Sequence, residues 1–347
     1  LTHRTKCGIG FFGNKNNLQK GLCRGKIITD YFTTANQNKG KTVMNFNDRE
    51  KIIALTPLWK GERLPDGRPK VEDKYLNALY GMTLEEVWKP IFVLGYEHQF
   101  VGGGENPLIP LHNDDRKLVG RAVTCTYCPT RPDLHEVQFG RGAADGLQGN
   151  YNQWVIDHLY ERDVVVCDMY DKIYKGTFLG GNLTTALQNR TKNGGAVIWG
   201  GVRDVEQMKK VPDVQVYYRG IDPTPIREFV MKDWNDITNF GGAVCLPGDV
   251  VFGAGGGVLF IPAHLVAEVV EGAAKTHVKD DFGFEMICQG KFTTAQIDKN
   301  TWTEEMLDML VNWIKTDPRG AEYRDLDWSK EYDLARNGDP NDTQTAL

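Results

Sequence analysis

GGNLTTALQNRTKNGGAVIWGGVRD, residues 180–204, is the stretch that decides the fold of this chain. Apolar residues at helical spacing predict a helix over residues 183–193, with Asn182 as its N-cap and Gly194 just past its end. The short apolar run over residues 195–199 predicts a buried strand. Residues 118–262 repeat this alternation of short apolar strands and helices, which is typical of an α/β domain.

The two ends of this stretch also predict a binding site. The turn before the helix consists of Gly180, Gly181, Asn182 and Leu183. A helix N-terminus presents free N–H groups and a partial positive charge, so this turn suits an anion. Arg203, at the end of the strand, has the planar fork that grips a carboxylate through two parallel hydrogen bonds. Asp204 supplies the hard oxygen that Mg²⁺ or Mn²⁺ prefers. We therefore expect a carboxylate substrate held against a divalent metal ion.

Each of these residues also has a purely structural interpretation. Asn182 would serve only as a helix cap, a role for which Asn and Asp are equally suited. Asp204 would cap a short helix, with Gln207 completing a capping box. Arg203 would be one partner of a structural ion pair. The sequence leaves these alternatives open.

Several motifs occur in an order that points to a known family. An Arg-Asp pair at positions 203 and 204 follows Asn182 after twenty intervening residues. Further matching segments are residues 118–124 (LVGRAVT), 162–168 (RDVVVCD), 218–225 (YRGIDPTP), 239–242 (NFGG), 247–251 (PGDVV) and 257–262 (GVLFIP). Over about residues 75–275 the chain resembles the RraA-like family. That family is named after the regulator of ribonuclease activity A and also contains 4-hydroxy-4-methyl-2-oxoglutarate aldolases and oxaloacetate decarboxylases.

The resemblance implies a compact α/β sandwich that assembles as a homotrimer or as a hexamer, a dimer of trimers. In this chain the sandwich would carry an added N-terminal helical region and a C-terminal helix. We expect four segments: a basic arm (1–43), a helical N-terminal extension (44–110), the RraA-like α/β domain (111–280), and a C-terminal helix with an acidic tail (281–347).

For function, the resemblance implies a class II, metal-dependent lyase, an aldolase or decarboxylase that cleaves a carbon–carbon bond of a 2-oxo acid. Arg203 and the amides of residues 181–183 would fix the substrate carboxylate. Asp204 would bind Mg²⁺ or Mn²⁺, a Lewis acid that makes a Schiff-base lysine unnecessary. Glu268 and Glu271 are candidate proton carriers across a subunit contact.

Two departures from the aldolase branch keep other functions open. Asn182 stands where those enzymes carry Asp, and residues 253–257 (GAGGG) replace an acidic "ADxDG" turn. A strand rather than a helix is predicted after this glycine run, so it suggests a tight turn and not a phosphate cradle. The lost acids favour a non-catalytic regulator that binds a protein partner, which the Arg203-Asp204 pair opposes. The long N-terminal addition favours a sugar-acid dehydratase or a lactone hydrolase.

Composition narrows the class of protein. At 347 residues the chain can bury a core that needs no disulfides. No apolar run approaches the roughly 18 residues of a membrane span, so we expect a soluble protein without a membrane partner. Seven cysteines at irregular spacing indicate a reducing compartment, the cytoplasm. The net charge of −5 gives no support to a nucleic-acid surface.

The remaining segments give weaker predictions. Residues 1–43 hold eight Lys or Arg against one Asp, which predicts a disordered or weakly docked arm before Met44, with a nucleic-acid-binding arm as the alternative. Helices are predicted over residues 70–81, from Leu84, and over residues 262–274. A last helix is predicted with Thr301 and Glu304 as its capping box, and the tail after residue 316 is expected to fray or to wrap a neighbour.

The cysteine and histidine patterns argue against a metal site of their own. Cys125 and Cys128 form a C-x-x-C on a predicted strand, where an offset of three sends the side chains to opposite faces. No second pair exists to complete a zinc site. The histidines at positions 98, 112, 135 and 158 lack metal-ligand spacing and are interpreted as surface or hydrogen-bonded residues.

Overall fold

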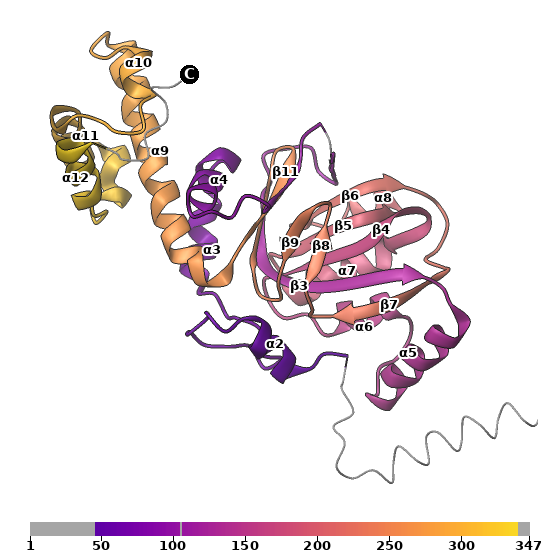
Figure 1. Ribbon diagram of the computed structural model, residues 1–347. Coiled ribbons are helices and arrows are strands. Elements are labelled where there is room, and N and C mark those ends of the chain that lie inside the picture. The colour runs from indigo at the N-terminus through magenta and orange to yellow at the C-terminus, as the bar shows by residue number, and fades with distance from the viewer. Residues whose placement is uncertain (1–45, 105, 339–347) are drawn as a thin grey trace, which may run out of the picture. The chain divides into compact units, whose positions relative to one another are not determined.

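The computed structural model describes residues 46–104 and 106–338, and the arm expected over residues 1–43 lies outside them. Its central feature is a mixed sheet (Figure 1). The strands are β1 (Phe100–Gly102), β2 (Ile109–Pro110), β3 (Leu118–Pro129), β4 (Asp163–Leu179), β5 (Gly195–Val202), β6 (Gln215–Ile221), β7 (Phe229–Trp234), β8 (Thr238–Phe240), β9 (Ala243–Cys245), β10 (Val250–Ala254) and β11 (Gly257–Ile261). The α/β fold class predicted from the sequence is confirmed.

The middle of the sheet is parallel and its flanks are antiparallel. Along the sheet the order is β1-β11-β10-β3-β4-β5-β6-β2, and β7 pairs with the second half of β3. Neighbours from β3 to β6 run parallel, whereas β1, β11 and β10 form an antiparallel flank. Strands β8 and β9 form a separate hairpin. The strands β1 and β2 come from the expected N-terminal extension, so that segment also contributes to the sheet.

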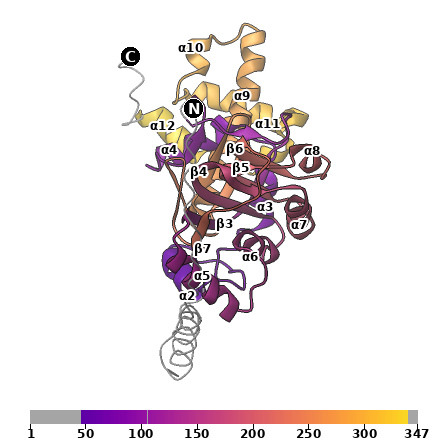
Figure 2. The same cartoon turned by 90° about the vertical axis from the view of Figure 1, so that its right-hand side faces the viewer.

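Side chains of the parallel strands are buried on both faces. Along β4, Val164 and Val166 face a cluster that contains Phe240 and Phe260. The alternate residues Val165 and Cys167 face a second cluster, which contains Trp154 of α6 and Leu187 of α7. Because both faces exclude water, the strand reads as one continuous apolar run rather than as an alternating pattern. Figure 2 shows α6 and α7 next to each other on the side of this second cluster.

Some of the helices cover the faces of this sheet, and others pack on α9. They are α2 (Arg49–Leu55), α3 (Asp73–Leu79), α4 (Leu84–Val93), α5 (Pro132–Ala144), α6 (Tyr151–Asp157), α7 (Gly181–Thr191), α8 (Val205–Met208), α9 (Val266–Cys288), α10 (Thr294–Ile297), α11 (Glu304–Thr316) and α12 (Ser329–Asn337), with 3₁₀ turns η1 (Ala263–Leu265) and η2 (Pro318–Tyr323). The predicted helices over residues 70–81 and from Leu84 are confirmed as α3 and α4. Thr83 caps α4 with a complete capping box.

Helix α9 is longer than the predicted segment 262–274. Its first half packs with α3 and α4 against β10 and β11. Its second half presents Val278, Phe282 and Met286 to a separate apolar cluster with α11. This second cluster extends the helix, because it buries a further stretch of the same apolar face.

The C-terminal region corrects two predictions. The N-cap of α11 is Thr303, whose hydroxyl accepts a hydrogen bond from the Met306 amide, and not Thr301. The apolar face of α11, formed by Met306, Leu310, Trp313 and Ile314, is buried. The tail after residue 316 is not frayed over its described part. It forms η2 and α12, which pack against α11.

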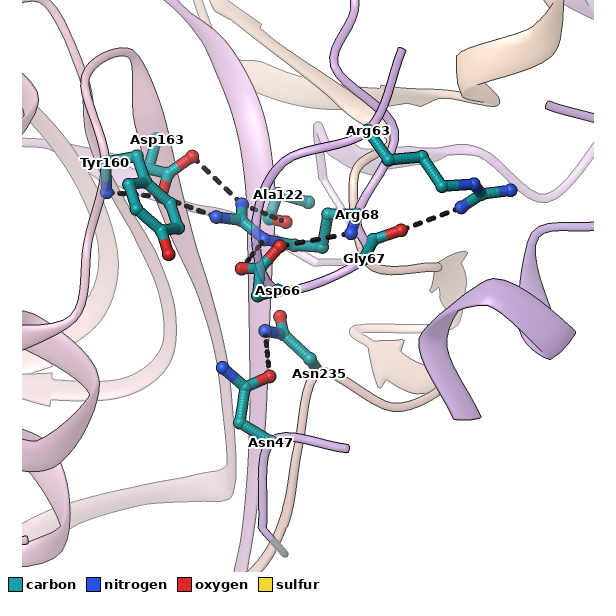
Figure 3. A network of polar contacts seen from close by, with 9 residues as sticks. All are labelled: Asn47, Arg63, Asp66, Gly67, Arg68, Ala122, Tyr160, Asp163 and Asn235. Atoms are coloured by element: carbon teal, nitrogen blue, oxygen red, sulfur yellow. Dashed lines mark hydrogen bonds and ion pairs between the residues drawn. The ribbon is translucent and has the colours of Figure 1, made fainter. Parts of the chain in front are cut away.

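A buried ion pair ties the N-terminal segment to the sheet (Figure 3). The Arg68 side chain is fully buried and donates to both carboxylate oxygens of Asp163 at 2.9 and 2.8 Å. It also donates to Asp66 at 2.7 Å and to the Ala122 carbonyl at 3.1 Å. Burial lowers the pKa of Arg68, but the two carboxylates more than offset this and leave the pKa above its ordinary value. The guanidinium is therefore charged and fully paired.

Candidate active site

The two ends of the 180–204 stretch meet at one edge of the sheet. Strands β4 and β5 run parallel, and their last residues, Leu179 and Val202, are register partners. The Arg203 amide donates to the Leu179 carbonyl at 3.0 Å. Since the carboxyl ends of parallel strands share one edge, the turn into α7 and the Arg203-Asp204 pair lie side by side, as the sequence predicted.

The start of α7 differs from the prediction. Its N-cap is Gly180 and its first residue is Gly181, so Asn182 is the second residue of the helix and not its cap. The Thr184 amide donates to the Gly180 carbonyl at 3.0 Å, which sets the start two residues earlier. The helix ends at Thr191, before Lys192 at a φ of 58°, and not at Asn193. The Asn182 side chain is consequently exposed at the mouth of the site.

Gly180 packs closely against the side chains of the Arg-Asp pair. A Cβ atom at this position would lie 2.7 Å from Asp204 Oδ2 and 3.1 Å from Arg203 Cγ. Its backbone is extended, a conformation open to every residue, so the need for glycine is steric. At Gly181 the corresponding contact, 2.4 Å, is with the tip of the Gln207 side chain. The absence of a side chain at position 180 thus lets Arg203 and Asp204 approach the helix.

Asp204 has an unusual backbone conformation and faces α7. Its φ is 56°, in the left-handed region that Asp tolerates better than most residues. It occupies the N-cap position of α8, but its side chain makes no capping hydrogen bond, so the capping box with Gln207 is not formed. Instead Oδ2 accepts a long 3.4 Å hydrogen bond from the Gly181 amide and lies 3.4 Å from Arg203 Nη1.

This geometry leaves fewer backbone N–H donors for the substrate than the sequence predicted. The Gly181 amide is directed at Asp204, which leaves the amides of Asn182 and Leu183 as the N-terminal donors without an intrahelical partner. The Arg203 and Asp204 side chains are 40% and 31% exposed. An ion pair that accessible is worth about 0–1 kcal/mol, so it is a poor explanation for Arg203 as a structural residue.

A cavity of about 530 Å³ opens beside this pair. It is lined by Asn150, Asn152, Gln153, Thr177, Phe178, Gly180, Asn182, Leu183, Arg203, Pro225, Ile226 and Arg227. Arg203, Asn182 and the turn into α7 therefore share one cavity. Asp204 is not part of its lining, because the carboxylate is turned toward Gly181.

Asn152 and Arg227 are two of the cavity residues that the sequence did not predict as site residues. Asn152 on α6 is buried, and its amide donates to the Phe178 carbonyl at 2.9 Å. Arg227 is a second guanidinium on the cavity wall, held by a backbone hydrogen bond to the Lys175 carbonyl at 2.8 Å. Arg227 follows the Thr-Pro motif at residues 224–225 by two positions, which was its one sequence signal. Asn152 had none, because only the packing of α6 brings it to the cavity.

The acidic groups near the cavity fit a metal ion that is only partly held by protein. Among the residues that the structure describes, no group of three or more His, Cys, Asp or Glu side chains is placed to hold one ion. Mg²⁺ is commonly bound through one or two carboxylates, with water and substrate oxygens completing its shell. Asp204 beside an open polar cavity supplies one such carboxylate. The donor set therefore fits a weakly held divalent ion rather than a closed structural site.

Other predicted residues lie away from this cavity. Glu268 and Glu271 are exposed on α9, and Glu271 pairs with Lys275 at 3.2 Å. They do not line the cavity of their own chain. The glycine run at residues 253–257 forms the tight turn of the β10–β11 hairpin, as predicted. In the described part of the chain Cys125 and Cys128 are free thiols, and no helix is both long and apolar enough to cross a membrane.

Comparisons with known proteins identify the relatives of this chain. The family described as RraA-like, Aldolase/RraA, matches residues 96–260. A Pseudomonas entomophila protein named "Putative 4-hydroxy-4-methyl-2-oxoglutarate aldolase" is 31% identical over 159 residues, 41% of this chain and 95% of that protein. Protein DlpA of Legionella pneumophila is 31% identical over 172 residues, 49% of this chain, but the chain spans only 25% of DlpA.

Solved structures show the same fold at low sequence identity. An uncharacterised protein of Pseudomonas syringae pv. tomato matches with a TM-score of 0.53 and 19% identity, over 68% of this chain and 98% of that one. A protein described as a novel cellulase from gut-associated microbes matches with a TM-score of 0.51 and 19% identity, over 64% of this chain and 90% of that one. Both likenesses extend beyond the segment that the family match covers.

Proposed function

Because the chain belongs to the RraA-like family, we propose that it is a divalent-metal-dependent lyase that cleaves a carbon–carbon bond of a 2-oxo acid. The observation that carries this proposal is the placement of Arg203 on the wall of a polar cavity, with Asp204 and the N-terminus of α7 directly beside it. Relatives that align over 95% of their length are named as aldolases.

The residues of the cavity would bind the substrate through its carboxylate. The Arg203 guanidinium offers two parallel N–H donors, and the amides of Asn182 and Leu183 add donors at the positive end of the helix. Asp204 would hold Mg²⁺ or Mn²⁺, which supplies positive charge next to the 2-oxo oxygen where negative charge develops. By fixing the carboxylate, Arg203 would orient the bond to be broken toward the open part of the cavity.

A pyruvate-release assay tests this function. 4-Hydroxy-4-methyl-2-oxoglutarate and oxaloacetate are offered with Mg²⁺, with and without EDTA, against enzyme-free controls. Arg203→Lys should lose at least tenfold in activity, because a point charge does not replace the planar fork and a charge-assisted hydrogen bond is worth about 1.5–3 kcal/mol. Arg190→Lys, an exposed substitution on α7, is the matched control. Release that EDTA leaves unchanged, or equal activity of the two variants, would contradict the proposal.

We also propose that the chain assembles as a homotrimer or hexamer, because no acid that could carry a proton lines the cavity among the described residues. A neighbouring subunit would then supply Glu268 or Glu271. Sedimentation equilibrium measures the assembly. If the protein is a monomer at assay concentrations and is fully active, no neighbouring subunit supplies the proton carrier and this proposal fails.

A further inference from the structure

A second chamber adjoins the candidate active site. Its volume is about 380 Å³, and it is lined by Thr130, His135, Phe139, Asn150, Tyr151, Asn152, Ile226, Arg227, Glu228 and Phe229. Four of these residues, Asn150, Asn152, Ile226 and Arg227, also line the cavity that contains Arg203. The two hollows therefore adjoin each other at these four residues, which form a shared wall.

The far wall of this chamber is aromatic and held in fixed geometry. The Phe139 ring on α5 and the Tyr151 ring on α6 meet edge to face, with centroids 5.7 Å apart at 82°. His135 lies against Tyr151 in the same manner, and the Tyr151 hydroxyl is 3.0 Å from His135 Nδ1. Phe139 nevertheless remains 37% exposed. An aromatic ring held in place but left open to a hollow is suited to receive another ring.

The charges around the chamber select its occupant. Glu228 is exposed and forms an ion pair with Lys175. Arg227 stands on the wall shared with the cavity of Arg203. The chamber thus offers neither an unpaired acid for a cation nor, on its far side, a cation for a second carboxylate. Besides these charged residues and the uncharged polar side chains of Thr130, Asn150 and Asn152, the rest of its lining is aromatic or aliphatic.

We propose, on the premise of the lyase function, that the substrate is a 2-oxo acid with an aromatic ring at the end away from its carboxylate, and that this chamber binds the ring. The carboxylate end lies at Arg203 and the ring lies between Phe139 and the shared wall. Phe139 is then the residue that determines specificity, and Tyr151 is a positioning residue that holds it.

Binding of two small 2-oxo acids tests the chamber without requiring turnover. Isothermal titration with pyruvate and with phenylpyruvate, each in the presence of Mg²⁺, compares ligands that differ by the ring. Phenylpyruvate should bind about tenfold more tightly, the effect of burying one ring against aromatic neighbours. In Phe139→Ala this preference should fall severalfold. Val137→Ala, on the exposed side of the same helix, should keep it.

Phe139 also packs against Trp154, with centroids 5.4 Å apart, so a second variant guards against a folding defect. Phe139→Leu keeps apolar volume and removes the ring, and it should lose most of the same preference. If phenylpyruvate binds no more tightly than pyruvate, or if both Phe139 variants retain the wild-type preference, the chamber does not hold a substrate ring.

Turnover separates this inference from the function on which it rests. The aldol adduct of pyruvate and benzaldehyde, 4-hydroxy-4-phenyl-2-oxobutanoate, should be cleaved with a higher kcat/KM than 4-hydroxy-4-methyl-2-oxoglutarate. If neither compound releases pyruvate while the binding preference holds, the lyase proposal fails and the ring site stands. If only 4-hydroxy-4-methyl-2-oxoglutarate is cleaved and the binding preference is missing, the ring site fails and the lyase proposal stands.

Discussion

Asp204 permits a clean test at the level of a single residue, because Asn shares its tolerance of the left-handed conformation. Asp204→Asn should abolish metal-dependent activity while the midpoint of thermal unfolding stays nearly unchanged. The matched control is Asp213→Asn, because Asp213 is exposed, has a φ of 53° and does not line the cavity. It makes the same change of charge and shape away from the site. Pyruvate release and Mg²⁺ titration are measured for both variants. Full turnover in Asp204→Asn would remove this residue from the site.

Asn182 can be tested in the same manner at the start of α7. An acid at this position would lie at the positive end of the helix and next to the proposed metal site, so Asn182→Asp should tighten Mg²⁺ binding severalfold. Asn189→Asp, exposed near the other end of α7, adds the same charge where the helix dipole disfavours it.

The effect of Asn182→Asp on turnover distinguishes two explanations for the asparagine at this position. A rise in cleavage of 4-hydroxy-2-oxo acids would indicate an aldolase that has lost one acid. A fall in native activity would indicate a site adapted to another anionic substrate. Unchanged metal affinity and unchanged turnover would leave Asn182 as an ordinary surface residue of α7.

Among the elements, the segment around Arg68 is anchored by the buried Arg68–Asp163 ion pair, and removing one partner should be strongly destabilising. Asp163→Asn would leave the fully buried guanidinium without its main partner, which costs about 3–5 kcal/mol in the free energy of unfolding. Asp133→Asn, which breaks the exposed pair with Arg131, should change stability little. Urea unfolding of both variants measures the difference. Similar midpoints for the two would mean that the buried pair is dispensable.

Local patterns predicted the elements that depend on local interactions. Leu84 begins α4 because Thr83 and Glu86 form a capping box within the segment itself. The start of α7 differs from the prediction because its N-cap is Gly180, which has no capping side chain and packs against Arg203 and Asp204, more than twenty residues away. Asn152 reaches the cavity only through the packing of α6. Spacing correctly placed the Arg203-Asp204 pair beside the turn before α7, because the parallel strands β4 and β5 end at the same edge of the sheet.

The pH dependence of unfolding belongs to the whole molecule, and one buried carboxyl should dominate part of it. Burial raises the pKa of Asp249 to about 7, although its oxygens accept hydrogen bonds from the amides of Leu246 and Ala263. Between about pH 4 and 7 the folded chain therefore holds a proton that the unfolded chain has lost. As the pH rises from about 4 to 7, the free energy of unfolding should therefore fall, by at most ~4 kcal/mol.

Comparison with Asp249→Asn isolates this contribution, because the amide does not titrate. Urea unfolding of both proteins at intervals from pH 4 to 8 should show a steeper decline for the wild type, which levels off above pH 7. Parallel curves for the two proteins would show that Asp249 titrates near its ordinary pKa in the folded state.

The pair of Arg68 and Asp163 also limits how the molecule can be divided. The family match begins at residue 96, so it includes the carboxylate of this pair and leaves out its cation. A fragment trimmed to residues 96–260 would carry a buried negative charge with nothing to neutralise it. It would also lose α3, α4 and α9, which cover β10 and β11. The stretch that matches the family therefore relies, in this chain, on residues that lie before it and after it.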